Sequence, residues 1–419
     1  MQLQYFEGVM KKMAPDSKIV LCTAEPTWYQ CTENAKATQF RTLDYFIRRI
    51  IYQEGVTKEE EQKNAKLILV LTGDSHHYAA YKANASYTAN IDKPETQKEW
   101  ETLFVTAGGG GAFLHPTHNL HDKTSSSGNA LQYEFPEKIK DEGRSFKSKI
   151  KWDFTFLECY PAKEKSKQMT WKNLLFGFQS LSLSALFGFL YAAVFLSVEN
   201  YSIVNDVAYN PIVSFSSHLA KMPLAGVTWE VAKEVLANPV ALVFSLFFVT
   251  IFFVVATLDK KRPNLMIGLG VTHLLVQFIL MCTLIGLSIH CIAHCFFSDD
   301  TNKMLAPSFR ISAFAVIFAV GFLVSSFVMG VYFIIANLGF KVHDNEAFSS
   351  LRVQDYKNLL RVKITKDELT VYVVRIKKVA KSWRDKTSAD KTVSDLVPHK
   401  TALQFEEVAS HVFKNNSWT

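Results

Sequence analysis

Four stretches of the chain are apolar over about twenty residues or more, the length that a helix needs to cross a bilayer. They are Leu174–Ser197, Pro239–Leu258, Leu265–Ile289 and Ile311–Leu338, and their apolar cores lack Asp, Glu, Lys and Arg. A helix buried in a water-soluble protein usually keeps a polar stripe, which these stretches do not have. The pattern therefore predicts a transmembrane region of about four helices over residues 172–340.

Lysines and arginines are distributed unevenly around these stretches. They are concentrated before the first, between the second and third, and after the fourth, whereas the two other loops hold only Lys221, Lys233, Lys303 and Arg310. Because cationic flanks are retained in the cytoplasm, we expect a multi-pass integral membrane protein whose N- and C-terminal parts are both cytoplasmic. The formal net charge of +7 is then mainly a topology signal that also suits membrane lipid, and no nucleic acid partner is expected.

Ahead of the membrane region, short apolar runs alternate with a helical repeat. The runs Lys18–Thr23, Leu67–Leu71 and Leu103–Ala107 predict buried strands. Between the first two, a helix is predicted to end at Gly55 and to point Arg48 and Arg49 away from its apolar face. The apolar positions of that helix are Leu43, Phe46, Ile47, Ile50 and Ile51. This alternation is typical of an α/β domain, which we assign to residues 1–165.

Beyond the membrane region, residues 341–419 form a third part, cytoplasmic and partly β. Apolar and polar positions alternate on both sides of Lys366–Glu368, which predicts a β-hairpin that turns there. The apolar positions are Val362, Ile364, Leu369, Val371, Val373 and Ile376. The polar tail from Lys386 to Thr419 is expected to end in a short helix.

The candidate chemistry gathers directly after the run Leu67–Leu71. Gly73-Asp74-Ser75-His76-His77-Tyr78 places carboxylate and imidazole groups on a strand-end loop, and such groups bind divalent ions. His77 is either a second-shell donor or a histidine that packs at the strand end. About thirty residues later comes the glycine run 108–111, which lacks the Gly-Lys-Ser/Thr of a nucleotide P-loop. We expect these glycines to allow a tight turn where two backbones approach each other.

Other histidines and the cysteines offer weaker candidates. His115, His118 and His121 are evenly spaced, but Pro116 argues against their sharing one regular helix. His290-Cys291-x-x-His294-Cys295 is either a zinc-like cluster or the end of a membrane helix. The six cysteines show no disulfide framework, which fits a reducing compartment.

Inside the apolar stretches, one ionisable residue and two glycines are notable. His273 lies within the third stretch, where an ionisable group is a functional candidate, although a neutral histidine bonded to a neighbouring helix is the plainer interpretation. Gly177 and Gly188 suggest close helix contacts in the first stretch.

Taken together, several segments resemble a calcineurin-like metallophosphoesterase domain of the membrane-attached subgroup. Leu69–Tyr78 and Val105–His118 look like the closing part of that domain. Gln4-Tyr5-Phe6, Cys22–Trp28 and, after the membrane region, His343–Arg352 and Asp355–Arg361 also look like segments of the subgroup. The resemblance implies a four-layer αββα fold and two divalent metal ions (Mn, Fe, Zn or Mg) that hydrolyse a phosphate-ester substrate.

The resemblance also implies which residues bind metal. The last ligand motif of the family is Gly-His-x-His, and its two histidines fall on Asp74 and His76 in this chain. Another family ligand falls on Ala24, where either the neighbouring Glu25 contributes or the position is lost or supplied differently. The loop with His115 and His118 would form part of the site wall, with His77 in a second shell or packed in the core.

The family motifs that supply the other ligands, Asp-x-His, Gly-Asp and Gly-Asn-His, do not precede residue 73 in a usable order. Two ligands do not hold a two-metal site. We therefore expect the C-terminal portion of a metallophosphoesterase-like domain, a hydrolase in its complete form with weak or no activity in this one. The alternative is a non-catalytic four-helix membrane protein that acts in transport, sensing or as a scaffold.

Overall fold

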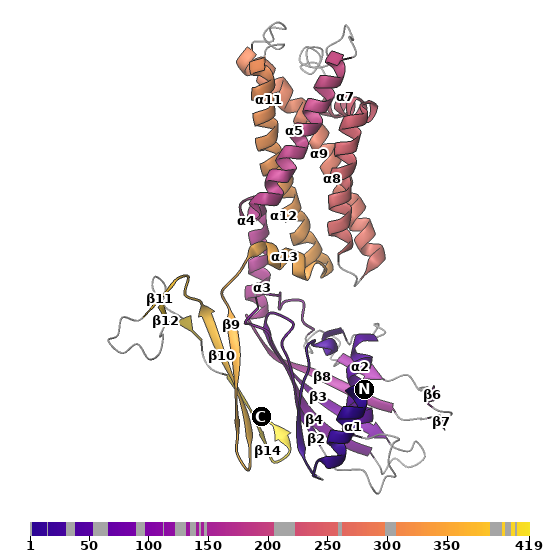
Figure 1. Cartoon of the computed structure of the whole chain (residues 1–419), viewed down its shortest axis with the longest axis vertical. Coiled ribbons are helices and arrows are strands. Elements are labelled where there is room, and N and C mark those ends of the chain that lie inside the picture. The colour runs from indigo at the N-terminus through magenta and orange to yellow at the C-terminus, as the bar shows by residue number, and fades with distance from the viewer. Residues whose placement is uncertain are drawn as a thin grey trace. The chain divides into compact units, whose positions relative to one another are not determined.

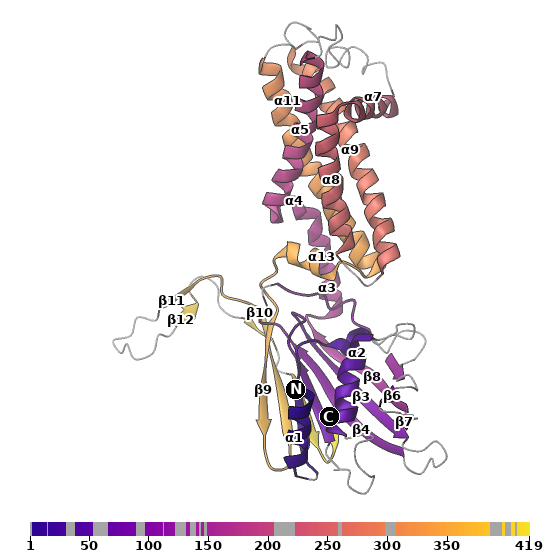
Figure 2. The same ribbon diagram turned by 45° about the vertical axis from the view of Figure 1, so that its right-hand side comes forward.

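The computed structural model describes residues 2–14, 16–30, 38–52, 66–88, 97–111, 113–121, 131–134, 140–141, 144–145, 149–204, 223–258, 262–297, 307–385, 396–398, 404–406 and 409–419. These residues form two compact units. A sheet unit combines Met1–Lys167 with Arg352–Thr419, and a helical unit comprises Gln168–Leu351. The three-part division expected from the sequence differs from this, because the chain returns after the helices to the unit in which it began (Figures 1 and 2).

The sheet unit is built on six strands in the order β1-β2-β4-β3-β8-β5. Strands β1, β2 and β4 are parallel, while β3, β8 and β5 continue the sheet in antiparallel fashion. The three strands predicted from apolar runs are confirmed as β1, β2 and β4. The six strands are β1 Lys18–Cys22, β2 Lys66–Thr72, β3 Tyr78–Thr88, β4 Gln97–Ala107, β5 Leu131–Glu134 and β8 Lys149–Tyr160.

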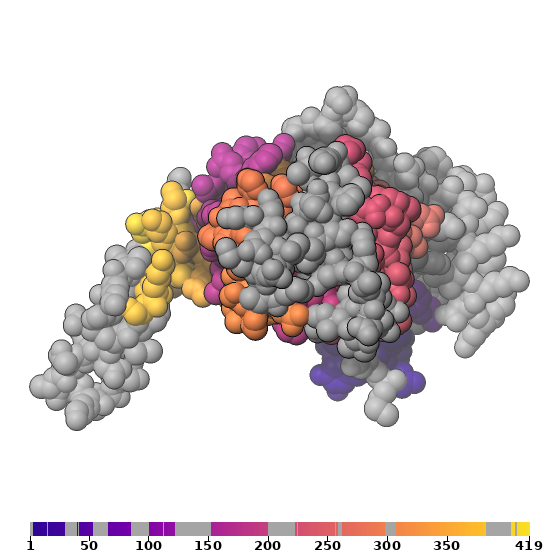
Figure 3. Space-filling view, turned by 90° about the horizontal axis from the view of Figure 1, so that it is seen from above, coloured from indigo at the N-terminus to yellow at the C-terminus, as the bar shows by residue number. Residues whose placement is uncertain are grey.

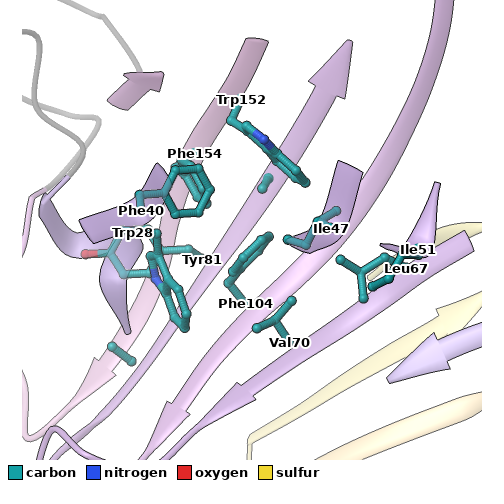
Figure 4. Close-up of a cluster of buried hydrophobic side chains, with 12 residues drawn as sticks. Trp28, Phe40, Ile47, Ile51, Leu67, Val70, Tyr81, Phe104, Trp152 and Phe154 are labelled. Carbon is teal, nitrogen blue, oxygen red and sulfur yellow. The ribbon is translucent and has the colours of Figure 1, made fainter. Parts of the chain in front are cut away.

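Helices cover one face of this sheet. They are α1 Gln2–Lys12, the short turn η1 Thr27–Gln30, α2 Thr38–Phe46 and its π-helical extension η2 Ile47–Ile51. Between this layer and the sheet lies an aromatic cluster (Figure 4) that includes Trp28, Phe40, Phe104, Trp152 and Phe154, each at most 1 % exposed. Ile47 and Ile51 join the cluster and Leu43 and Phe46 pack against it, so the predicted apolar helix face is confirmed.

One prediction about this helix is wrong. Arg48 does not point to solvent but is buried, with 8 % of its surface exposed. Its guanidinium lies 3.9 Å from the carboxylate of Asp44, one turn earlier, and Asp44 also accepts a hydrogen bond from Trp152 at 2.7 Å. The nearby carboxylate compensates the buried cation. The predicted helix end at Gly55 lies outside the described residues.

A second sheet packs on the opposite face of the first. It consists of β9 Lys357–Ile364, β10 Leu369–Lys378, β13 Gln404–Phe405, β14 Ala409–Lys414 and β15 Ser417–Trp418. Residues of β2, β3 and β4 form a buried cluster with Leu369, Val371, Val373, Phe413 and Trp418. The described part of the sheet unit thus has one helical layer and two large sheets, which fits the α/β class, while the four-layer form stays a proposal. Two further two-stranded sheets pair β6 Lys140–Asp141 with β7 Arg144–Ser145 and β11 Trp383–Asp385 with β12 Leu396–Pro398.

The predicted hairpin is confirmed, because β9 and β10 pair in antiparallel register from Ile364↔Leu369 to Lys357↔Ile376. The predicted short helix at the end of the chain is wrong. The last described residues form β14 and β15 instead. Val371, Val373 and Phe413 alternate toward the buried cluster between the sheets, and burial on one side favours strands over a helix.

The helical unit follows α3 Lys163–Thr170, in which the chain leaves the sheet unit. Its helices are η5 Trp171–Leu175, α4 Phe176–Gln179, α5 Leu181–Val204, α7 Leu224–Ala237, α8 Pro239–Thr257, α9 Pro263–Phe297, α11 Pro307–Val320, η6 Gly321–Ser325, α12 Ser326–Ile334, η7 Ile335–Gly339 and α13 Asp344–Leu351. The chain from α11 to η7 is one helix with two π-helical turns, η6 and η7.

Three of these helices are long and apolar enough to cross a membrane: Leu181–Glu199, Pro263–Phe297 and Pro307–Gly339. A fourth candidate is the pair Ala225–Ala237 and Pro239–Val255, which is bent by 104°. Asn238 stands at the bend, where its side chain accepts hydrogen bonds from Val240 and Ala241 and donates one of 2.7 Å to the carbonyl of Ser197. Seen end-on in Figure 3, α7 (red) and α11 (orange) are visible at one end of this unit. The described part of the chain thus contains three or four helices that are long and apolar enough to span a membrane, which is consistent with a membrane protein.

Candidate functional site

Three loops meet where the parallel strands β1, β2 and β4 end. The amides of Gly73 and Asp74, after β2, both donate to the carbonyl of Ala24, after β1, at 3.2 and 3.1 Å. The amide of Gly108, after β4, donates to the carbonyl of His77 at 3.1 Å. These bonds hold the loops to one another as a single edge. In α/β proteins, ligands bind outside the carboxyl ends of parallel strands.

The glycine run fits closely against this edge. A Cβ atom on Gly108 would lie 2.1 Å from the carbonyl oxygen of Ser75, and one on Gly111 would lie 2.3 Å from the ring of His76. On Gly109 it would lie 2.0 Å from the side chain of Asn358. Each distance is too short for any side chain, so this path requires glycine. The expectation that the run permits a close approach of two backbones is confirmed at Gly108 and Gly109, where backbone atoms of Ser75 and Asn358 are close, whereas Gly111 makes room for the ring of His76.

The two predicted metal ligands differ in exposure. Asp74 is exposed, whereas His76 is half-buried and packs its ring on that of His115, with centroids 4.3 Å apart. The amide of His76 donates to Nδ1 of His115 at 3.2 Å, and the amide of His115 donates to the carbonyl of His76 at 3.3 Å. The structure therefore brings His115 next to His76. Nδ1 of His76 is buried without a hydrogen-bond partner among the described residues.

His77 belongs to the core. It is 3 % exposed, its Nε2 lies 3.4 Å from the hydroxyl of Tyr29, and the two rings stack. The Tyr29 hydroxyl donates to Thr106 at 2.7 Å. Burial, reinforced by the neighbouring His115 and His76, lowers the pKa of His77 to about 3. His77 is thus neutral at physiological pH. It packs against Tyr29 at the end of the strand, as one of the two interpretations expected.

Glu25 and His118 lie on the loops of this region without joining the pair of rings. Glu25 is exposed, next to Ala24 on the loop after β1. His118 is half-buried, and its Nδ1 lies 2.9 Å from the hydroxyl of Ser166, which also accepts a hydrogen bond from the amide of Thr117. The polar contacts of His118 therefore fix the loop to α3.

The residues predicted to bind metal do not form a complete site. Among the described residues, no group of three or more His, Cys, Asp or Glu side chains is arranged to hold a metal ion. This holds for Asp74 and His76 with their neighbours and for the cluster from His290 to Cys295, whose two cysteines are exposed thiols. Asp74 and His76 are suitable ligands for a divalent ion, but they supply only part of the ligands that such an ion needs.

Two residues at this edge were not predicted, and both come from the start of β9. The ammonium of Lys357 donates to the carbonyl of Gly111. Asn358 is 6 % exposed, lies against Gly109, and has neither atom of its amide hydrogen-bonded among the described residues. Partial burial lowers the pKa of Lys357. In the sequence, both residues lie in the segment Asp355–Arg361. The sequence pattern alone does not indicate that this segment reaches the edge of the sheet.

No protein-family model, curated protein or solved structure matches this chain.

Proposed function

We propose that the chain is a membrane-anchored, metallophosphoesterase-like protein whose complete form hydrolyses a phosphate ester with two divalent ions. The proposal places the sheet unit in the cytoplasm, on the side of the lysine-rich flanks. The observation that supports it most is the convergence of the loops after β1, β2 and β4, with the exposed Asp74 beside the His76–His115 pair.

The chemistry of this edge suits a phosphate ester and a divalent ion. Carboxylate and imidazole are ligands for Mn, Fe and Zn, and carboxylate also suits Mg. Lys357 adds a positive charge where the glycine run ends. Because a two-metal centre needs more ligands than Asp74 and His76, we expect this chain to bind metal weakly and to turn over substrate slowly or not at all.

Metal binding tests the proposal without relying on activity. Mn²⁺ titrated into the purified chain is expected to bind, and Asp74→Ala or His76→Ala should weaken binding by about tenfold or more, since each removes a ligand. The matched control is Asp367→Ala, which removes an exposed carboxylate at the hairpin turn. Turnover of a chromogenic phosphodiester with Mn²⁺ is measured in the same samples.

Two results would contradict the proposal. One is wild-type protein that binds no Mn²⁺ at millimolar concentration. The other is equal binding by the wild type and both ligand variants, which would place any bound ion elsewhere.

A second proposal, a non-catalytic membrane protein that transports or senses, is favoured by one observation in the helical unit. His273 is 6 % exposed inside a candidate span. Ionisable side chains are rare in such spans and usually serve a function there.

A further inference from the structure

Four polar side chains follow one another from the middle of α9 to the first turns of α13, all within the helical unit. The ring of His273 packs on that of Tyr332, with centroids 4.3 Å apart. The Tyr332 hydroxyl lies 2.9 Å from Nε2 of His343, and Nδ1 of His343 lies 3.4 Å from the carboxylate of Glu346. Three hydrogen-bonding or stacking contacts thus connect a buried histidine with a carboxylate.

The inner end of this series is an imidazole without a polar partner. Nε2 of His273 is buried and makes no hydrogen bond among the described residues. The rings of Phe252 on α8 and Tyr332 on α12 flank it, with centroids 4.8 and 4.3 Å away. A proton that reaches His273 therefore lies between two aromatic rings, and no polar partner among the described residues competes for Nε2.

The outer end of the series meets solvent. His343 is fully buried, while 21 % of the Glu346 side chain is exposed. A carboxylate close to an imidazole favours the protonated imidazolium. Glu346 is thus placed to take a proton from water and to stabilise it on His343.

The neighbouring polar groups have their own partners. Asp344 of α13 accepts a hydrogen bond of 2.9 Å from Asn337. Gln277, one turn along α9 from His273, exchanges two hydrogen bonds with Ser325, at 2.9 and 3.1 Å. Titratable groups near the two histidines thus include Tyr332, Asp344 and Glu346, while α8 contributes the apolar Phe252.

We propose that the helical unit binds one proton at the pair His273 and His343, with Glu346 as its entrance. The proton adds to the Glu346 carboxylate from water and passes to Nδ1 of His343, so that only O–H and N–H bonds form and break. A charge on His343 disfavours a second charge on His273 across the Tyr332 ring, so at most one of the two histidines is protonated at a time. This inference deepens the second proposed function and is independent of Asp74 and His76, which belong to the sheet unit.

The test follows the imidazole nitrogens by NMR. The full chain, with ¹⁵N-labelled histidine and reconstituted in nanodiscs, is titrated as wild type and as His273→Gln, His343→Gln and Glu346→Gln. Removal of His343 is expected to raise the titration midpoint of His273 by about one pH unit, because a competing charge is lost. Glu346→Gln removes the carboxylate beside Nδ1 of His343 and is expected to weaken proton binding by the pair.

Controls make the outcome decisive. His290→Gln, the same change near the far end of α9, should leave both midpoints unchanged. Tyr332→Phe keeps the ring and removes the bond to His343, so it reports on the coupling with the least disturbance of folding. Unchanged midpoints in His343→Gln, Glu346→Gln and Tyr332→Phe overturn the proposal, as does a His273 that stays neutral from about pH 4 to 9.

Discussion

The sheet unit and the helical unit both bury large aromatic rings, Phe187 and Phe248 among them in the helical unit, but their elements come together in different ways. In the sheet unit, the large rings of Trp28, Phe104 and Trp152 are completely buried between strands and helices. In the helical unit, helices meet where side chains are missing: a Cβ on Gly188 would lie 2.6 Å from the carbonyl of Phe318, and one on Gly330 would lie 2.0 Å from that of Asn173. Water drives aromatic burial in the first case. In lipid that force between helices is absent, and close backbone packing replaces it.

The largest expected effect is on the aromatic core. Phe104→Ala should lower the free energy of unfolding of the sheet unit by about 3–5 kcal/mol, because it removes apolar contact and leaves a cavity against Trp28, Trp152 and Phe154. Denaturant unfolding followed by tryptophan fluorescence measures the change. The control is Phe405→Ala on β13, whose ring is 61 % exposed, for which we expect a change within about 0.5 kcal/mol. Equal losses in the two variants would contradict the assigned core.

The next effect concerns the glycine contacts. Gly188→Leu should destabilise the helical unit by about 1–3 kcal/mol, because the added side chain forces α5 away from the helix that begins with α11. Gly268→Leu on α9 is the matched control, since nothing lies within 4 Å of a Cβ at that position. Thermal unfolding of the detergent-solubilised protein compares the two. If Gly268→Leu proves the more harmful, the helices are not packed through Gly188.

Prediction from sequence succeeded where one physical pattern governs a segment. The apolar runs of β1, β2 and β4 and the alternation in β9 and β10 each depend on burial alone. It failed at Arg48, because the nearby carboxylate that permits burial of its charge is visible only in three dimensions. The tail strands β14 and β15 were missed for a similar reason, since β15 pairs with β14 and β10, the partner of β14, lies about forty residues earlier.

The candidate site shows the same division. Asp74 and His76 stand out because they follow a strand, and the close approach of the glycine run is implied by its composition. The role of His77 was decided by Tyr29, about fifty residues away, and the arrival of Lys357 and Asn358 at the edge depends on contacts across most of the chain. Local patterns indicate which reactive side chains the sequence offers. Tertiary contacts decide which of these side chains lie together in one site.

The smallest expected effect comes from a polar cluster between the two sheets. Glu158 on β8 accepts hydrogen bonds from Tyr78 at 2.9 Å and from Arg375, and lies 3.3 Å from His411. Although burial opposes ionisation, its partners His411, Arg375 and Tyr78 together lower the pKa of Glu158 from its ordinary value of 4.5 to about 2. The carboxylate is therefore charged in the folded state over the whole neutral and mildly acidic range.

Because the folded state holds this carboxylate more acidic than the unfolded chain, its contribution to stability is complete above the ordinary pKa of 4.5 and is lost as the pH falls toward about 2. Glu158→Gln should cost about 1–2 kcal/mol at pH 7, less than a fully buried pair because the side chain is 28 % exposed. Unfolding measured from neutral to acidic pH should show the two proteins converging as the pH drops. If the difference in the free energy of unfolding between the two proteins stayed constant with pH, the charge of Glu158 would contribute nothing. The cluster would then stabilise the fold through packing only, as the apolar contacts of the helical unit do.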